Sequence, residues 1–402
     1  MEVINTTKLS DYLVKKKIFS KLPFFLIDVG AAGGIHECWK VFDQDLKAIG
    51  FEPIISECEQ LNKKSRNAKY YPYYVAAEDK NIDIDTIDAY CSSLFVRSSA
   101  HAATEIADHG QTPSSSPDTD YSSLFDFTKN DSETEPIDQN HAPSLPSSVN
   151  TEVETIDENQ VSDSSRVDDI PSPFAQETIS LDRFMLEKSL DNPDFVKVDT
   201  DGFDYQVLNG AKSILSNPST LGLLVECQFH GSAGPHSNTF RNIDRLLVEN
   251  GFTMFALEPI KYSKKTLPGQ FSNFLFGETN MGQVCWANAL YLRDLARIDG
   301  KPAFHYSPEQ ILKLACLFEI YNLPDCAAEL LLHFQDYLSS TVSVAECLNL
   351  LTKHVSSHLT YDQYLNRFNH NPYNFFPPLK SGAKKLFKFC KKRYTEKLAN
   401  KK

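Results

Sequence analysis

The sequence lacks the motifs of several common classes of protein. Its nine cysteines are scattered and none forms a Cys-x-x-Cys pair, so neither a zinc ribbon nor a dithiol redox motif is indicated. No apolar run approaches the roughly 20 residues needed to span a bilayer, and residues 1–20 contain no apolar signal-peptide core. Together with the odd number of cysteines, these absences predict a cytoplasmic protein in a reducing compartment.

Basic residues are nearly absent from one segment, and acidic residues from another. Residues 100–175 hold 16 Asp and Glu against 2 Lys and Arg, whereas residues 380–402 hold ten Lys and Arg and one acid. The net charge of −13 is therefore an average that indicates no partner by itself. Apolar periodicity also disappears across 99–174, so we expect this low-complexity acidic insertion to be disordered.

The rest of the chain has the rhythm of an α/β protein. Short apolar runs alternate with helical stretches, which predicts a parallel sheet with helices on its faces. The expected strands are "FFLIDVG" (24–30), "LKAIGFEP" (46–53), "YYPYYVAA" (70–77), the starts of 177–187 and 194–215, "LGLLVECQF" (221–229), "TMFALEPI" (253–260) and "WANALYLRD" (286–294). Within 194–215 a glycine turn and a helix follow the strand. Further on, 307–321 and 323–338 predict an antiparallel helical pair, each with a proline near its first turn.

Small residues crowd the end of the first predicted strand. Gly30, Ala32 and Gly34 leave room for a cofactor to approach the backbone. The G-x-G-x-x-G motif of dinucleotide-binding proteins is absent, and Asp28 precedes the first glycine by two residues. A carboxylate there repels a pyrophosphate but attracts a cofactor with an amino group and a sulfonium, such as S-adenosylmethionine. The alternative is a plain tight connection in which Asp28 caps a helix.

Glu52 supports the cofactor interpretation. It ends the second predicted strand, 24 residues after Asp28. An acid at that position can accept hydrogen bonds from both hydroxyls of a ribose. Asp28, the turn and Glu52 together therefore favour a cofactor site over a plain connection.

Several stretches resemble the FkbM-type methyltransferases, a family of S-adenosylmethionine-dependent enzymes that methylate hydroxyl oxygens. The matching stretches are "LIDVGAAGGI", "GFEP", "ETISLDRF", "PDFVKVDTDGFDYQVLNGA", "LLVECQF", "NGFTMFALEP" and "GQVCWANALYLRD". They cover 24–98 and 175–296, and the block from Pro193 to Ala211 is the most distinctive. The resemblance implies a Rossmann-like class I methyltransferase sheet with helices on both faces and, outside the match, a small C-terminal helical region.

The resemblance also implies cofactor contacts from three places: the glycine turn, the end of the second strand and the backbone after the third. The residues at these places are Asp28, Gly30, Ala32, Gly34, Glu52, Ala77 and Asp79. The chain departs from the commoner family pattern at Ala32 and Gly33, where Asn and a larger apolar residue often occur. It also has Asp204 where Glu is more usual.

Candidate catalytic residues follow two other predicted strands. Ligands of open α/β sheets sit beyond the carboxyl ends of the strands, and transfer to a hydroxyl needs a group that removes its proton. Asp199 stands at such an end, and Lys197 shares its strand face because side chains repeat every second residue. Glu226 lies in an apolar strand, with His230 continuing on its face. Asp199 and Glu226 are the leading acid–base candidates, ahead of His230. Lys197 would orient a carboxylate or hold an anionic group of the substrate.

These residues also have structural interpretations. Lys197 would then form a buried ion pair and His230 would be a surface residue. Asp201 and Asp204, which flank a glycine at a helix start, are better explained as helix caps. Asp199, Glu226 and His230 would suit Mg²⁺ or Mn²⁺, but they include no closely spaced ligand pair, so no metal is expected.

The basic end of the chain, residues 379–402, carries an apolar stripe at helical spacing. Such a helix often contacts an anionic membrane surface peripherally. The slightly favoured alternative is that the stripe packs on the protein and the lysines are solvated. Nucleic-acid binding is not expected, because no basic face occurs elsewhere. The expected organisation is an N-terminal segment (1–21), a methyltransferase domain (22–298) with the insertion (99–174), a helical domain (299–378) and this tail.

The sequence therefore predicts an S-adenosylmethionine-dependent O-methyltransferase. Its partner would be a small-molecule or glycan acceptor, a sugar or natural-product-like compound methylated on a hydroxyl by in-line transfer with a carboxylate as general base. One alternative is a catalytically inactive module that binds the cofactor and serves interaction. Another is a nicotinamide-dependent oxidoreductase, to which the absent G-x-G-x-x-G motif is a direct objection. Nothing in the sequence indicates an oligomeric state.

Overall fold

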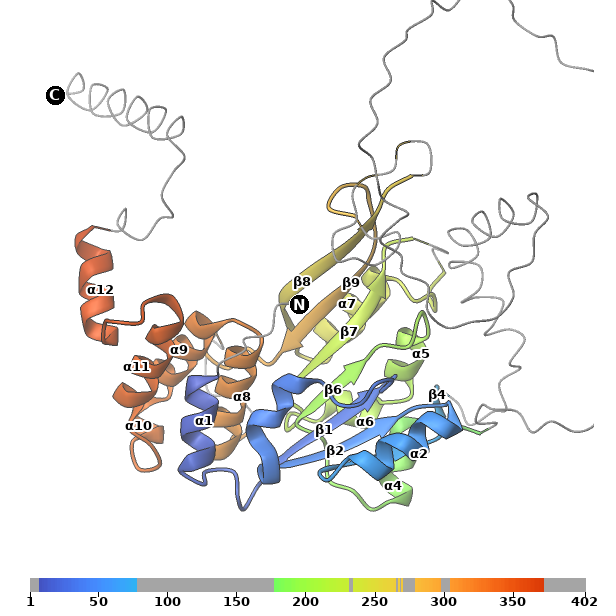
Figure 1. Cartoon of the computed structure of the whole chain (residues 1–402), viewed down its shortest axis with the longest axis horizontal. Helices are drawn as coiled ribbons and strands as arrows, with labels where there is room; N and C mark the ends of the chain where they lie inside the picture. The colour runs from blue at the N-terminus through green and yellow to red at the C-terminus, as the bar shows by residue number, and fades with distance from the viewer. Residues whose placement is uncertain are drawn as a thin grey trace, which may run out of the picture. The chain divides into compact units, whose positions relative to one another are not determined.

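The computed structural model describes residues 7–77, 177–230, 234–264, 267, 269, 279–297 and 304–371. The predicted acidic insertion and the basic tail lie outside these residues, and so does Asp79. The described part is a mixed α/β fold with a seven-stranded central sheet (Figure 1). None of the helices in these ranges is long and apolar enough to cross a membrane.

The sheet has the strand order β3-β2-β1-β6-β7-β9-β8. Its strands are β1 (Phe24–Val29), β2 (Leu46–Phe51), β3 (Ala68–Tyr71), β6 (Phe195–Val198), β7 (Gly222–Gln228), β8 (Thr253–Tyr262) and β9 (Gln283–Leu292). Neighbouring strands pair in parallel except at β9, which is antiparallel to both β7 and β8. This arrangement confirms the predicted Rossmann-like sheet, in which the carboxyl ends of β1, β2, β6 and β7 meet at one edge.

Helices cover both faces of the sheet. Successive side chains of β1 point to opposite faces, and every residue of β1 is buried. Phe24 and Leu26 join a hydrophobic cluster with α1 (Lys8–Lys15), the 3₁₀ segment η1 (Glu37–Asp45) and the C-terminal helices. Phe25 and Ile27 join a second cluster on the other face. The helices of that face are α4 (Leu181–Glu187), α5 (Asp204–Asn209), α6 (Lys212–Ser216) and α7 (Phe240–Glu249).

Two predicted elements are each divided in the structure. The stretch 70–77 does not form one strand, because Pro72 has no amide proton for a sheet ladder. β3 ends before it, and β4 (Tyr74–Val75) pairs with β5 (Thr178–Ile179) in a separate two-stranded sheet. The helix expected after the glycine turn in 194–215 is divided into α5 and α6 around Gly210. An added Cβ on Gly210 would lie 2.3 Å from the carbonyl oxygen of Ala76.

The C-terminal helices include the predicted antiparallel pair. α8 (Pro308–Ile320) and α9 (Pro324–His333) pack on each other, and each begins with a proline. The helices that follow are α10 (Gln335–Leu338), α11 (Val344–Val355) and α12 (Tyr361–His370). These helices share a hydrophobic cluster with the sheet, and the proposed domain boundary near 298 stays a prediction.

A buried ion pair fastens α8 to the start of the sheet. Lys313 is 1 % exposed, and its Nζ lies 2.7 Å from Oδ2 of Asp194 and 2.8 Å from the carbonyl oxygen of Pro23. The same Asp194 oxygen accepts from the amide of Phe25 at 2.8 Å. One carboxylate therefore joins the beginning of β1 to a helix almost 300 residues later in the chain.

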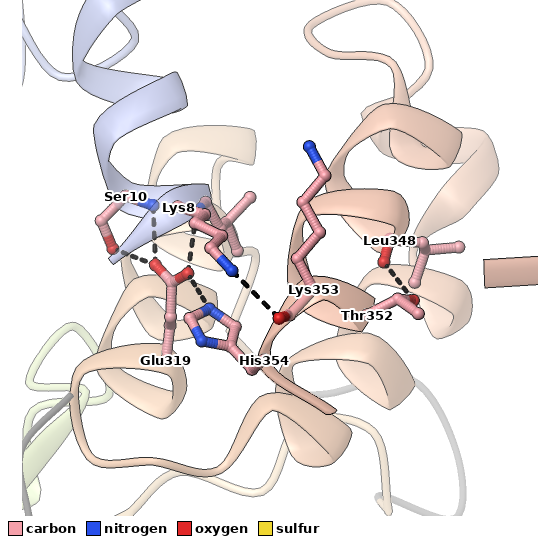
Figure 2. Close-up of polar contacts among 8 residues, drawn as sticks. Lys8, Ser10, Glu319, Leu348, Thr352, Lys353 and His354 are labelled. Atoms are coloured by element: carbon pink, nitrogen blue, oxygen red, sulfur yellow. Dashed lines mark hydrogen bonds and ion pairs between the residues drawn. The ribbon is translucent and has the colours of Figure 1, made fainter. Parts of the chain in front are cut away.

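A second buried carboxylate, Glu319 of α8, fastens the N-terminal helix (Figure 2). Its side chain accepts hydrogen bonds from the amides of Leu9 and Ser10, and from Oγ of Ser10, each at 2.7 Å. Nε2 of His354, from α11, lies 2.8 Å from Oε1. Burial raises the pKa of Glu319, but these hydrogen bonds outweigh it and the net pKa is lowered. The carboxylate therefore satisfies free amides at the start of α1.

Glu319→Ala is expected to destabilise the protein by about 3–5 kcal/mol, since it leaves several buried donors without an acceptor. Urea unfolding at neutral pH measures the loss, with Glu329→Ala, an exposed site on α9, as the control. Because the folded pKa of Glu319 lies below its ordinary 4.5, the wild-type advantage should be full above that value and disappear as the pH falls below it. A difference under about 1 kcal/mol from the control would contradict this role.

Candidate active site

The glycine turn after β1 is shaped by the close approach of two strand ends. Gly30, Gly33 and Gly34 have positive φ angles of 77°, 74° and 91°. At Gly30 an added Cβ would lie 1.8 Å from the carbonyl oxygen of Asp199, which follows β6. Only glycine fits there. At Gly33 no atom of the described residues, apart from the adjoining ones, lies within 4 Å of an added Cβ, so this part of the turn is open.

Backbone hydrogen bonds place the turn beside the end of β2. The carbonyl of Phe51 accepts from the amides of Gly30 at 3.1 Å and Ala31 at 3.0 Å. Glu52, the next residue, is 3 % exposed, and its Oε1 accepts from the amide of Ile54 at 2.8 Å. Burial raises the pKa of Glu52. The acid expected to bind a ribose thus lies one residue from the carbonyl that holds the turn.

Glu57 and Tyr70 also hold the turn, although no motif in the sequence points to them. Oε1 of Glu57, in the first turn of α2 (Ile55–Lys64), accepts from the amide of Gly33 at 2.8 Å. The Tyr70 hydroxyl accepts from the amide of Ile35 at 3.1 Å. An acid in the first turn of a helix is typical of a simple match to the helix dipole. Only the fold therefore reveals that Glu57 has a partner in the cofactor turn.

Lys197 lies between two of the predicted carboxylates. It is paired in register with Asp28 across β1 and β6. Its Nζ lies 3.2 Å from Oδ1 of Asp28 and 3.3 Å from Oδ2 of Asp199, and donates to the carbonyl of Gly30 at 3.4 Å. The Asp28 side chain is 4 % exposed and that of Asp199 is 43 % exposed. Asp28 is therefore the buried anchor of this ion pair, and Asp199 is its solvent-facing end.

The charges of these three groups are coupled. Burial raises the pKa of Asp28 to about 6, although the attraction of Lys197 opposes this. Burial lowers the pKa of Lys197, but the two carboxylates outweigh it and the net pKa is raised. Asp28 and Lys197 are therefore both charged at neutral pH. Lys197 thus forms the buried ion pair with Asp28 and, in the same position, contacts the carboxylate of Asp199 that it was expected to orient.

Asp204 has a structural role in the turn after β6. Its side chain is fully buried, and it accepts from the amide of Thr200 at 3.0 Å and from Nδ2 of Asn238 at 3.0 Å. Burial raises the pKa of Asp204 to about 6. Asp204 was expected to cap the start of the helix, but its carboxylate instead accepts a hydrogen bond from the preceding turn. Nothing in the sequence indicated Asn238 as its partner.

Among the described carboxylates whose pKa is raised, Glu226 has one of the largest increases. It lies on β7 and is half-buried. Among the described residues, none forms a hydrogen bond or ion pair with its side chain. Burial raises its pKa to about 8, with further contributions from the carboxylates of Asp199, Asp204 and Asp201. Glu226 therefore exchanges its proton near neutral pH, as a general base must.

The remaining predicted residues are placed less centrally. Ala32 is exposed on the glycine turn, and Ala77 is exposed at the end of a described range, after the bond from the amide of Ala76 to the carbonyl of Ile179. His230 lines a separate cavity beyond β7, and burial lowers its pKa. Within the described ranges, no group of three or more His, Cys, Asp or Glu is placed to hold a metal ion.

A comparison with protein families decides the class of this site. A model of the methyltransferase FkbM domain matches residues 28–254, more than half of the chain. The chain belongs to the FkbM methyltransferase domain family. The FkbM match begins at Asp28, ends within β8, and contains the glycine turn, Glu52, Lys197, Asp199 and Glu226. The helices from α8 onward lie outside it. No curated protein sequence matches the chain.

The displaced pKa of Glu226 predicts a pH-dependent effect on the stability of this FkbM domain. The folded state holds the Glu226 proton up to about pH 8, whereas the unfolded chain releases it near its ordinary 4.5. Wild type should therefore lose stability relative to Glu226→Gln as the pH rises from 4.5 to 8, by up to about 5 kcal/mol. Urea unfolding of both proteins at several pH values measures this difference. A constant difference across the range would contradict the displaced pKa.

Proposed function

We propose that this FkbM methyltransferase domain transfers a methyl group from S-adenosylmethionine to a hydroxyl oxygen of a sugar or natural-product-like acceptor. One observation carries the proposal. The glycine turn, buried Glu52, the Asp28–Lys197–Asp199 group and Glu226 all lie at the carboxyl edge of the sheet. Ligands of open α/β sheets bind at this edge.

The residues present fit S-adenosylmethionine better than a dinucleotide. The turn faces open space at Gly33, so a cofactor can approach its backbone. Glu52, at the tip of β2, supplies a carboxylate for ribose hydroxyls. Asp28 and Asp199 make the surroundings of the turn anionic despite Lys197, which favours a sulfonium and disfavours a pyrophosphate.

The chain's own residues would supply alignment and proton removal. S-adenosylmethionine, when bound, supplies a methyl group on a sulfonium, so that an oxygen–carbon bond forms as the carbon–sulfur pair of electrons returns to sulfur. Glu226 takes the proton of the acceptor hydroxyl, and its pKa of about 8 suits that task. Lys197 holds Asp199 in position, and exposed Asp199 can accept a hydrogen bond from the same hydroxyl.

Binding of S-adenosylhomocysteine and of NAD⁺ to the wild-type chain tests the class of cofactor. Calorimetric titration is expected to give micromolar binding of S-adenosylhomocysteine, about −8 kcal/mol, and no measurable binding of NAD⁺. The opposite preference would favour the oxidoreductase alternative. Tight S-adenosylhomocysteine binding with no methyl transfer to any hydroxyl compound would favour the inactive binding module.

A further inference from the structure

A cavity of about 360 Å³ lies beyond the carboxyl end of β7. It lies between the start of α5 and the loop that leads into α7. The lining residues are Gly202, Phe203, Gln206, Gln228, His230, Gly234, Pro235, His236, Ser237, Asn238 and Thr239. Its volume is at the lower end of the roughly 300–1,000 Å³ of small-molecule sites. A ligand of about the size of a monosaccharide therefore suits it.

Three residues of the cavity lining each have a buried polar atom without a hydrogen-bond partner among the described residues. These atoms are Oε1 of Gln206, Nε2 of His230 and Oγ1 of Thr239. A buried polar group without a partner costs about 1–3 kcal/mol, so native proteins seldom leave several together. All three atoms can accept a hydrogen bond. They are therefore suited to a ligand that brings hydroxyl donors.

The unpaired hydroxyl of Thr239 is not used to cap a helix. Thr239 occupies the N-cap of α7, where a threonine hydroxyl normally accepts from a backbone amide of the first turn. Here the Thr239 side chain makes no such bond. Its backbone instead bridges to Gln228 at the end of β7, which sets Thr239 beside the cavity wall.

The loop that forms one wall is held in place from two sides. Oδ1 of Asn238 accepts from the amide of Tyr205 at 2.8 Å, and its Nδ2 donates to Asp204. Nδ2 of Asn242 donates to the carbonyls of Gly234 and Ser237, each at 2.9 Å. The wall is therefore positioned by the same Asp204 carboxylate that fixes the turn after Asp199.

Two of the lining residues follow the proposed catalytic residues closely along the chain. Gln228 lies two residues after Glu226 on β7, so the two side chains share a face of the strand. Gly202 belongs to the turn that begins at Asp199. Among the described residues that line the cavity, none is Asp, Glu, Lys or Arg. A charged ligand would find no compensating carboxylate, ammonium or guanidinium group among them, whereas a neutral polyol needs none.

We propose that this cavity is the acceptor subsite, that it binds a neutral, polyhydroxylated sugar ring, and that Gln206, His230 and Thr239 determine its specificity. The assignment rests on the proposed methyl transfer to a hydroxyl. Phosphorylated sugars and uronic acids are excluded by the same chemistry. The site thus selects by uncharged hydrogen bonds, while the carboxylates beside it act on the reacting hydroxyl.

Saturation-transfer NMR with defined probes tests the subsite. The probes are methyl α-D-glucopyranoside, methyl α-D-mannopyranoside and methyl β-D-galactopyranoside, compared with glucose 6-phosphate and glucuronate, in the presence and absence of S-adenosylhomocysteine. Thr239→Val removes the hydroxyl and keeps the shape of the side chain. Thr220→Val is the matched control, since Oγ1 of Thr220 is also buried without a partner among the described residues but lies before the amino end of β7.

At least one neutral glycoside should bind the wild type, with Thr239→Val at least tenfold weaker and Thr220→Val within twofold. The charged sugars should bind at least tenfold more weakly than that glycoside. The midpoint temperature of thermal unfolding should not be lower in Thr239→Val than in wild type, because the substitution removes an unpaired buried hydroxyl. Absence of neutral glycoside binding, equal binding of charged sugars, or unchanged binding by Thr239→Val would each overturn the assignment. S-adenosylhomocysteine binding, titrated separately, tests the proposed function independently.

Discussion

Glu226→Gln is expected to lower methyl transfer by roughly 10²–10⁴-fold, the usual contribution of a general base, while S-adenosylhomocysteine binds within about twofold of wild type. The amide keeps the size of the side chain but cannot take a proton. The rate is measured as transfer of labelled methyl from S-adenosylmethionine to the hydroxyl compound that the wild type methylates best. Glu249→Gln, an exposed site at the end of α7, is the control.

The pH profile distinguishes a general base from a residue that only shapes the site. The wild-type kcat/KM should rise about tenfold per pH unit below its inflection, as expected for one ionisation, and level off above about 8 because Glu226 must lose its proton first. The residual activity of Glu226→Gln should not show this inflection. A variant that retains both the rate and the inflection would assign the base to another group, with exposed Asp199 the next candidate.

Gly30→Ala is expected to abolish S-adenosylhomocysteine binding and to destabilise the fold by more than about 3 kcal/mol. The new Cβ would lie 1.8 Å from the carbonyl oxygen of Asp199, so the ends of β1 and β6 would have to separate. That movement would also disturb Lys197, which donates to the carbonyl of Gly30. Calorimetric titration and urea unfolding measure the two effects.

Gly33→Ala is the matched control for this prediction. Gly33 has nearly the same φ, 74° against 77°, but an added Cβ there would meet no atom within 4 Å from the described residues beyond its chain neighbours. Alanine at Gly33 should therefore cost only the strain of the left-handed conformation, about 1–2 kcal/mol. Equal destabilisation by the two alanines would mean that the conformation, and not the approach of β6, makes Gly30 necessary.

The sheet could be predicted from the sequence because its signals are local. The apolar runs that became β1, β2, β6 and β7 each end at a glycine or an acid, and their alternation with helical stretches indicates a parallel sheet. Pro72 also carries a local signal, its missing amide proton, which accounts for the division of the stretch 70–77. Local sequence patterns thus predict a strand, and a proline predicts the residue at which that strand ends.

The pairing of side chains could not be predicted in the same way. Asp28 and Lys197 are separated by 169 residues, and only the register of β1 against β6 brings them together. The sequence placed Lys197 on the face of Asp199 but gave no indication that it also holds Asp28. Glu57 is a similar case, because its bond to Gly33 depends on how α2 lies over the turn. Partners set by strand register and helix placement are long-range properties of the fold.

The most direct test of a cofactor site at the carboxyl edge of the sheet is calorimetric titration of S-adenosylhomocysteine into wild type, Glu52→Ala and Glu59→Ala. Glu59 is an exposed residue of α2, only seven positions away, and serves as the control. Wild type and Glu59→Ala should bind with micromolar affinity, and binding to Glu52→Ala should be weaker by at least tenfold, about 1.4 kcal/mol. Failure of the wild type to bind, or equal binding by Glu52→Ala, would contradict a cofactor site at the carboxyl edge of this sheet.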